Sequence, residues 1–301
     1  MAFKSSRGRD LGKGNIYYKS SNLGLGYGGG GGSTPLVITG GSTETPGNGY
    51  KYHTFLSDGA FVTTGDIAAV DILMVAGGGG GGSGGGGTGG GGGAGGVRFY
   101  PDLPVAAGEY DIIIGQGGTG AASYNSGGTR GSDTTAFGKT ANGGGHSNYN
   151  YSTIAPGGSG AGASYNTGNG NGNVGGDDPL ASPVKEGYNG GGGGGGGAGE
   201  NGQPTAGGNG IQLPAFTGTL IGQPLLDPYN GYYGGGGGTG KDGTNGAPGG
   251  NGGGGHGQSR NASSNGTVTP GVDGLGGGGG GHSNGAAGGG GSGIVVVRYA
   301  V

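Results

Sequence analysis

Residues 77–96 read GGGGGGSGGGGTGGGGGAGG, directly between the apolar segment AAVDILMVA and the segment VRFYPDLPV. A flexible linker normally joins two domains, whereas this run joins two segments with the composition of β-strands. Further glycine blocks follow at 190–197, 234–238, 252–255, 276–281 and 288–291. We therefore expect glycine to form ordered structure in this chain and not a tether.

Glycine accounts for 101 of the 301 residues, but no Gly-X-Y register is sustained and only 13 residues are proline, which disfavours a collagen triple helix. A chain in the polyproline II conformation has no internal hydrogen bonds, so its N–H and C=O groups point outward. Without side chains, such helices can approach closely and bond laterally. The sequence therefore predicts a bundle of polyglycine II helices and loops over about 77–96 and 140–292.

Low-complexity disorder is the alternative, because ordering glycine costs more backbone entropy than ordering any other residue and Gly/Ser tracts are commonly flexible. Many satisfied lateral hydrogen bonds, with the ends of each run fixed by packed structure, are needed to offset that cost. The strand-like segments beside the glycine runs favour the ordered alternative.

The composition sets further bounds on the class of protein. Hydrophobic residues make up only 29%, so any apolar core is small, and the net charge of -3 gives no argument for nucleic acid or an anionic membrane. The absence of cysteine removes disulfides and thiolate chemistry. No apolar run reaches the length of a membrane span. The first 32 residues lack the apolar core of a secretory signal, which favours a virion component over a secreted matrix protein.

Residues 1–32 are basic, whereas the remainder of the chain is acidic. We interpret them as a docking segment that attaches the protein to a larger assembly, although a solvated tail is the plainer alternative. The cations of this segment are the docking candidates, and they are opposed only by Asp10: Lys4, Arg7, Arg9, Lys13 and Lys19.

A linker is expected over 33–49, and the residue composition changes from residue 50 onward. Alternating and β-branched apolar residues, separated by turn signals such as Ser57-Asp58-Gly59, predict strands within about 50–76, 97–115, 133–139 and 293–301. A bend is expected at 101–104, where two prolines occur. The fold class predicted is all-β with little or no α-helix: a small, discontinuous β-sandwich that carries the glycine bundle over residues 50–301.

Four of these segments, in this order, resemble the glycine-rich domain common in phage and bacterial surface proteins. The matching segments are YHTF at 52–55, VDILMV at 70–75, AGEYDIIIGQGG at 107–118 and GSGIVVVRY at 291–299. The resemblance implies a small sandwich with glycine helices packed between its strands. Polyglycine II bundles are similar to the tail-tip adhesins of T-even-like phages, which display receptor-binding loops. This chain differs from those adhesins by its strands and its basic N-terminal segment.

No motif for catalysis, metal binding or cofactor binding occurs beyond what the glycine-rich composition produces by chance. GxGxxG-like matches occur throughout because glycine is so common, and no HExxH or Ser/His/Asp motif is present. Histidine occurs at 53, 146, 256 and 282, and polar capping of a bundle edge is favoured over a metal pair. We expect no enzymatic activity, no catalytic residue, no metal and no cofactor.

Tyrosine is the informative aromatic residue, with 16 copies against 6 Phe and no Trp. The loops inserted between glycine blocks place tyrosine beside Asn and Gly, a composition typical of adaptable recognition surfaces. The alternative is that these tyrosine rings cover bundle edges or subunit contacts. The apolar insert at 211–226 is compatible with both interpretations. The receptor-binding candidates are Tyr149, Tyr151, Tyr165, Tyr188, Tyr229, Tyr232 and Tyr233.

These features together predict a non-enzymatic structural protein of a phage virion. It would be a fibre or decoration component, docked to other virion proteins through residues 1–32 and displaying its Tyr/Asn loops, with a host cell-surface glycan or protein as partner. A homo-oligomer is expected, and trimers are common in such fibres. The alternatives are a secreted or cell-surface matrix protein and an ice-binding protein, but regularly spaced threonine, which would favour the latter, is absent.

Overall fold

The computed structural model describes residues 35–84, 87–149, 157–163, 186–242, 246–259 and 267–301. Its contacts separate residues 1–34 from a second compact unit, 35–301, and the fold below is that of the second unit. The predicted docking residues Lys4, Arg7, Arg9, Lys13 and Lys19 therefore lie outside the described residues.

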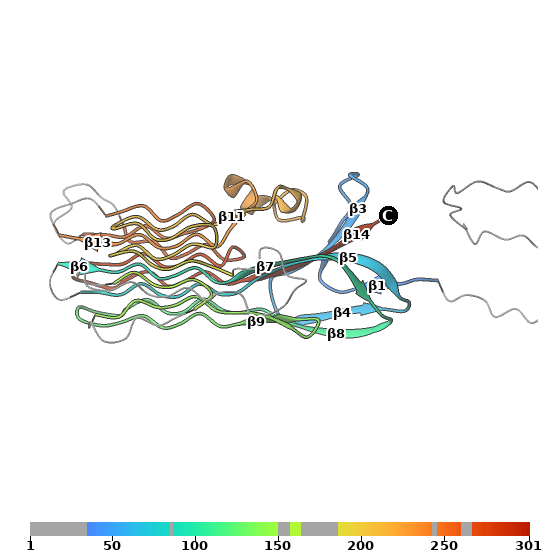
Figure 1. Ribbon diagram of the computed structural model, residues 1–301, viewed down its shortest axis with the longest axis horizontal. Helices are drawn as coiled ribbons and strands as arrows, with labels where there is room; N and C mark the ends of the chain where they lie inside the picture. Colours follow the sequence, from blue (N-terminus) through green and yellow to red (C-terminus); the bar gives the residue numbers. More distant parts are fainter. Residues whose placement is uncertain (1–34, 85–86, 150–156, 164–185, 243–245, 260–266) are drawn as a thin grey trace, which may run out of the picture. The chain divides into compact units, whose positions relative to one another are not determined.

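Two five-stranded antiparallel sheets form a sandwich at one end of this unit (Figure 1). The first sheet has the order β1 (Ile38–Thr39), β4 (Gly59–Thr63), β8 (Gly108–Ile113), β9 (Thr134–Ala136), β10 (Lys139–Ala141). The second has the order β2 (Ser42–Glu44), β3 (Tyr50–Phe55), β14 (Ile294–Ala300), β5 (Ile67–Val75), β7 (Val97–Val105). The predicted all-β class is confirmed.

Smaller elements complete the described fold. Two-residue strands pair as β6 (Thr88–Gly89) with β13 (Gly240–Lys241), and as β11 (Ile211–Gln212) with β12 (Tyr232–Tyr233). Two 3₁₀-helices, η1 (Pro214–Phe216) and η2 (Pro224–Tyr229), lie in the insert between β11 and β12. The helical residues of the described chain are confined to this insert.

The central strand β14 explains why its sequence is an unbroken β-branched run. Val295 and Val297 pack between the two sheets, against residues such as Phe61, whereas Val296 faces the other side of the second sheet. There the insert covers it with Phe216 and other apolar residues, also including Ile221 and Leu226. Because both faces of the strand are buried, no polar alternation is required. The insert at 211–226 is thus a cover for the sandwich.

Two local expectations differ from the structure. The segment predicted as a linker over 33–49 contributes β1 and β2, which pair with β4 and β3 at the edges of the two sheets. These strands are only two and three residues long, too short for a periodic signal. The bend expected at 101–104 falls inside β7 and does not separate two strands: the register against β5 shifts near Val70, and Asp102 has a positive φ of 51°. An edge strand tolerates proline because one of its sides needs no backbone donor.

The glycine segments extend from the sandwich as a bundle of extended chains lying side by side (Figure 1). Residues 77–83 show how they bond. Gly79 and Gly82 donate N–H groups to the carbonyls of the same neighbour, Gly93 and Gly90, at 2.9 Å, and the residues between them donate to two other segments. Every third residue therefore faces the same neighbour, which is the repeat of a polyglycine II helix. This pattern confirms the predicted bundle.

Helix 77–83 has six neighbours, so its lattice is hexagonal. Three antiparallel neighbours accept its N–H groups, around Gly93, Thr129 and Gly288. Three parallel neighbours donate to its carbonyls, around Gly118, Gly144 and Gly279. Adjacent neighbours also bond to one another, as in the 2.8 Å contact from Gly291 N to Gly277 O. Donor and acceptor directions consequently alternate around the helix, and its buried amides are saturated.

The purity of each glycine run reflects its place in the lattice. The segments 77–82, 234–238 and 276–281 are glycine only, are buried throughout, and are surrounded on all sides by other chain segments. At the periphery, side chains recur at every third position and are exposed, as for Gln116, Thr119 and Ala122. A threefold helix turns every third residue to the same side. Outer helices therefore tolerate one side chain per turn, whereas central helices admit only an occasional small one, such as the buried Ala94.

Gly79→Ala tests this steric requirement. A Cβ at residue 79 would lie 2.0 Å from the carbonyl oxygen of Gly145, which is held in the lattice and cannot yield like a flexible side chain. We expect the free energy of unfolding to fall by about 3 kcal/mol or more, at the upper end of overpacking effects. Chemical denaturation followed by circular dichroism measures it.

Gly59→Ala is the matched control, because its Cβ would meet only the Phe55 ring at 3.5 Å. We expect that change to alter stability by about 0.5 kcal/mol or less. Equal losses in the two variants would contradict a sterically closed lattice.

Candidate functional site

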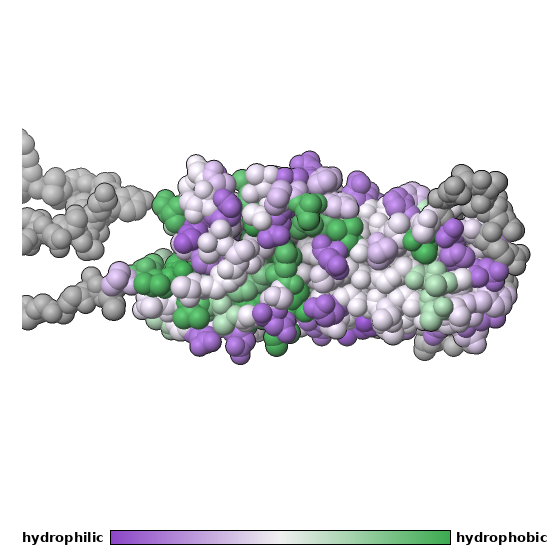
Figure 2. All heavy atoms as spheres, turned by 180° about the vertical axis from the view of Figure 1, so that it is seen from behind, coloured by the Kyte–Doolittle hydropathy of each residue, from purple (hydrophilic) through white to green (hydrophobic). Residues whose placement is uncertain are grey.

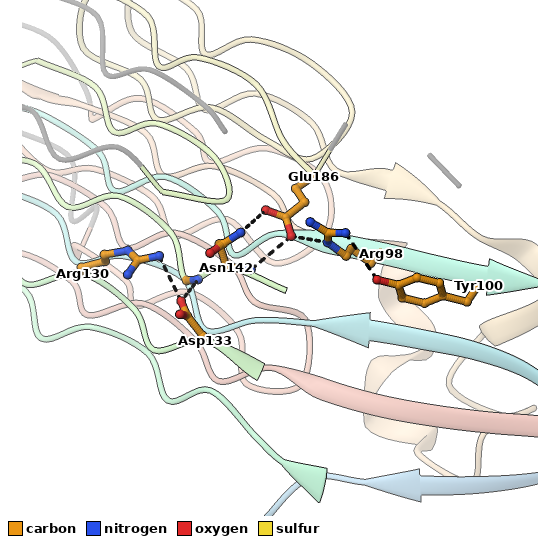
Figure 3. A network of polar contacts seen from close by, with 7 residues as sticks. Arg98, Tyr100, Arg130, Asp133, Asn142 and Glu186 are labelled. Carbon is orange, nitrogen blue, oxygen red and sulfur yellow. Dashed lines mark hydrogen bonds and ion pairs between the residues drawn. The ribbon is translucent and has the colours of Figure 1, made fainter. Parts of the chain in front are cut away.

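A buried charged cluster lies where the sandwich meets the bundle (Figure 3). Arg98, on β7, donates from Nε to Oε1 of Glu186, and Asn142 donates from Nδ2 to Oε2 at 2.7 Å. The backbone N–H of Asn142 also points to this carboxylate, at 3.3 Å. Glu186 is fully buried and Arg98 nearly so. Both oxygens of Glu186 are thus engaged by the protein itself.

The electrostatics of this cluster are those of a structural clamp. Burial by itself would lower the pKa of Arg98, but its hydrogen bond to Glu186 and the charge of that carboxylate raise the pKa above the ordinary value. Nearby, Asp133 accepts from Arg130 at 3.0 Å and from the N–H of Gly143 at 2.7 Å. Each carboxylate fixes a segment that enters the bundle. The cluster has the chemistry of an anchor and not of a catalytic site.

A second ion pair joins two residues of the strand motifs. Arg298, on β14, donates from Nε to Oδ2 of Asp71, on β5, at 2.8 Å. Its guanidinium lies 4.5 Å from the ring centroid of Tyr50 and 4.9 Å from that of Phe216. Burial opposes the charge of Arg298, but hydrogen bonds with Tyr52 and Asp71 raise its pKa. The ion pair joins two strands of the second sheet, and the contact of Arg298 with Phe216 links them to the insert.

The histidines do not converge on one site in the described chain. His53 is buried, with Nδ1 2.7 Å from the carbonyl oxygen of Gly40 and its ring stacked on Tyr299. His146 and His282 lie in different bundle segments, and His256 is exposed. Burial lowers the pKa of His53, His146 and His282, although Asp242 partly opposes it at His282. No group of three or more His, Asp or Glu side chains suited to a metal ion occurs among the residues described.

The end of the bundle remote from the sandwich, here called the outer end, gathers loops from distant parts of the sequence. Loop 121–126 and segment 147–149 are adjacent there, since Gly128 N donates to Ser147 O at 3.0 Å. Each carries an exposed aromatic residue, Tyr124 at 48% and Tyr149 at 37%. Figure 2 shows strongly hydrophobic residues mainly over the sandwich half of one face, whereas the bundle half is paler and more polar. The outer end is the candidate contact surface.

The structure separates the tyrosine candidates. Tyr149 lies at the outer end, Tyr188 is half-buried on the bundle, and Tyr229 and Tyr232 are half-buried in the insert near the sandwich. Tyr233 is buried in the core beneath that insert and donates its hydroxyl to Phe216 O, so its ring is not available to a partner. Burial also raises the pKa of this phenol. Tyr151 and Tyr165 lie outside the described residues.

Tyr124 was missed by the sequence reasoning. Its context, ASYN at 122–125, recurs as ASYN at 163–166 around the candidate Tyr165. This repeat is the signal that could have found it. Asn125, beside Tyr124, adopts a positive φ of 57°, which places a tight turn at the tip of the loop.

The fold and this surface define a β-sandwich protein that supports a glycine lattice with loops at its outer end. The chain matches the model of the glycine-rich domain family over residues 54–300, which is most of its length, and it belongs to that family. A comparison with curated proteins found no match. Among the described residues, no helix has the length and apolar character needed to cross a membrane.

Glu186→Gln tests the anchor beside the bundle. Removing the carboxylate charge leaves Arg98 buried without its counter-ion, and we expect a loss of about 3–5 kcal/mol in the free energy of unfolding. Denaturant titration of the full chain measures it, and Arg98→Met in the same chain should recover part of the loss. Arg130→Met removes an exposed pair and is expected to cost about 1 kcal/mol or less. A Glu186→Gln loss as small as that of Arg130→Met would contradict the anchor role.

The pH dependence of stability follows from the buried His53 and the half-buried His146 and His282. Their pKa values in the folded state lie below the ordinary 6.5, so the unfolded chain binds more protons as the pH falls below that value. Their contribution to stability is therefore complete above pH 6.5 and is lost as the pH falls through the lowered values. Denaturation midpoints at a series of pH values should decline in that range.

His53→Gln should flatten part of this decline, because it removes one titrating ring while keeping a donor for Gly40 O. The exposed His256→Gln is the control and should leave the profile unchanged. An identical decline in the His53→Gln variant and the unaltered protein would show that the buried ring does not contribute.

Proposed function

We propose that this chain is a non-enzymatic structural protein of a phage particle, a fibre or decoration component that displays the outer end for contact with a host surface. Residues 1–32 attach it to other virion proteins, and a cell-surface glycan or protein is the partner of the outer end. The protein acts at the extracellular surface of the particle. It acts as a rigid support that displays the outer end and catalyses no reaction.

One observation supports this proposal most directly. Tyr124 and Tyr149 are exposed on adjacent loops at the outer end. Each loop is connected to helices that are hydrogen-bonded within the glycine lattice. A rigid base reduces the conformational entropy that a contact loop loses on binding. Tyrosine supplies a large amphipathic face with few rotatable bonds. The described carboxylates of the junction, by contrast, are engaged in anchoring the chain.

Two measurements test the proposal. Immunogold electron microscopy of phage particles with an antibody against this chain should label the particle surface; particles that carry the chain but bind no antibody at their surface would contradict it. Labelled full chain should also sediment with host cells in a saturable manner.

The Tyr124→Ser/Tyr149→Ser variant is expected to bind host cells at least tenfold more weakly, because two central aromatic contacts commonly carry most of the binding energy of an interface. Leu225→Ser is the control, since this residue is 89% exposed but lies in the insert near the sandwich. Its variant should bind as the unaltered protein does. Equal losses in both variants, or none in either, would argue against the outer end as the contact surface.

A further inference from the structure

On one flank of the bundle, the described residues leave a lattice position incomplete. Helix 253–258 bonds to four neighbouring segments, which supply partners around Gly235, Ala247, Thr269 and Gly281. A central helix such as 77–83 has six neighbours with alternating donor and acceptor directions. Two directions around helix 253–258 are therefore not filled by the described parts of the chain.

The backbone groups in one of these directions form a threefold register. No described residue donates to the carbonyl oxygens of Gly254 and Gly257, which are three residues apart and so face the same side. On the adjoining helix, the N–H of Gly249 has no acceptor among the described residues. The alternation seen around helix 77–83 places this donor and these acceptors on the same unfilled position. An extended backbone lying there could both donate and accept.

An open groove of about 560 Å³ lies at this position, between residues 249–254 and residues 269–272. Its lining includes Gly249 and Gly254 and the exposed residues His256 and Pro270. Five of the lining residues are glycines, and the others, such as Tyr229, Asn251 and Val272, carry side chains. A bound chain with side chains at every position could not approach as closely as the helices of the lattice approach one another, which selects for glycine.

We propose that this groove binds the glycine run 28–32 of a second copy of the chain, which then completes the lattice position. The run is five consecutive glycines outside the compact unit that begins at Pro35. Glycine-only runs in the described chain, such as 77–82 and 276–281, occupy fully surrounded positions. Residues 28–32 carry no side chain, so this run can approach the groove backbone as closely as the helices of the lattice approach one another.

Charge and chain length favour a second copy as the source. Residues 1–34 contain five Lys and Arg against one acidic residue, whereas residues 35–301 contain eight against fifteen, for net charges of +4 and -7. Opposite charges favour association between the N-terminal segment of one copy and the body of another. Only Ser33 and Thr34 separate the run from Pro35, just ahead of β1, which lies on the side of the sandwich away from the bundle (Figure 1). The three Cα–Cα steps from Gly32 to Pro35 span at most about 11 Å, too little to lead back to the groove of the same molecule.

Such a contact joins different surfaces of the two copies. A heterologous interface of this kind produces rings or open chains of subunits, depending on whether the rotation closes. The inference concerns self-assembly and does not depend on the phage assignment. Host-cell binding and self-assembly are measured separately, so either can fail without the other.

Sedimentation velocity of the full chain over a range of concentrations tests the proposal. We expect the average mass of the unaltered protein to rise with concentration. Two single variants should each remain monomeric: His256→Trp, which places a bulky ring in the groove, and Gly30→Val, which places a branched side chain in the run. Gln116→Trp, an exposed position on another helix of the bundle, should assemble as the unaltered protein does.

Mixing the two inactive variants provides the decisive measurement. His256→Trp retains an intact run and Gly30→Val retains an intact groove, so an equimolar mixture should form a one-to-one complex that neither forms alone. Circular dichroism melting curves check that each variant is folded. A fluorescent peptide of residues 24–34 should bind the Gly30→Val chain at least tenfold more tightly than it binds the His256→Trp chain.

Several results would overturn the proposal. An unaltered protein that stays monomeric at every concentration excludes the contact. Assembly of the His256→Trp variant at the level of the unaltered protein excludes the groove. Assembly of Gly30→Val while His256→Trp is monomeric shows that another segment occupies the groove, which excludes residues 28–32.

Discussion

The structure depends on lateral hydrogen bonds between backbones that carry no side chains. Each polyglycine II helix has its donors and acceptors on the outside, so it is stable only where neighbours supply partners in several directions. Helix 77–83 meets this condition with six neighbours, and a Cβ on Gly79 would fall inside the contact distance of a neighbouring carbonyl. The same closeness that satisfies the amides therefore excludes a side chain at positions such as Gly79. A high glycine content is here a condition of order.

The sandwich compensates for the entropy that ordering glycine costs. Its strands enclose the chain between 75 and 294, and β14 closes the second sheet between β3 and β5 after the last glycine segment. Both faces of β14 are buried, by the first sheet and by the insert, so the ends of the bundle are held by an ordinary apolar core. Buried carboxylates at the junction add fixed points, with Glu186 bonded to Arg98 and Asn142. The two halves of the fold thus support one another.

This division of labour also shapes what the protein can do. The described ionisable clusters hold the junction and the insert in place, and the described pairs such as Arg298 with Asp71 are engaged with protein groups. The bundle, in turn, presents loops of distant sequence origin on a common rigid base at its outer end, among them those of Tyr124 and Tyr149. Its flank leaves backbone groups of Gly249 and Gly254 without partners in the described chain. Such an arrangement favours two activities: recognition of a partner by the outer-end loops, and assembly with another chain through backbone hydrogen bonds.

The sequence by itself determined the all-β class, the strand segments and the polyglycine II bundle, because glycine purity, β-branched runs and strand order are local signals. It did not determine β1 and β2, which are too short for periodicity and exist only through pairing with β4 and β3. Nor did it separate the tyrosines: Tyr233 and Tyr149 have similar Asn- and Gly-rich surroundings, yet one is buried and the other exposed. Only the tertiary structure decided which loops meet at the outer end and which lattice position the described residues leave unfilled, because both depend on contacts between segments far apart in the chain.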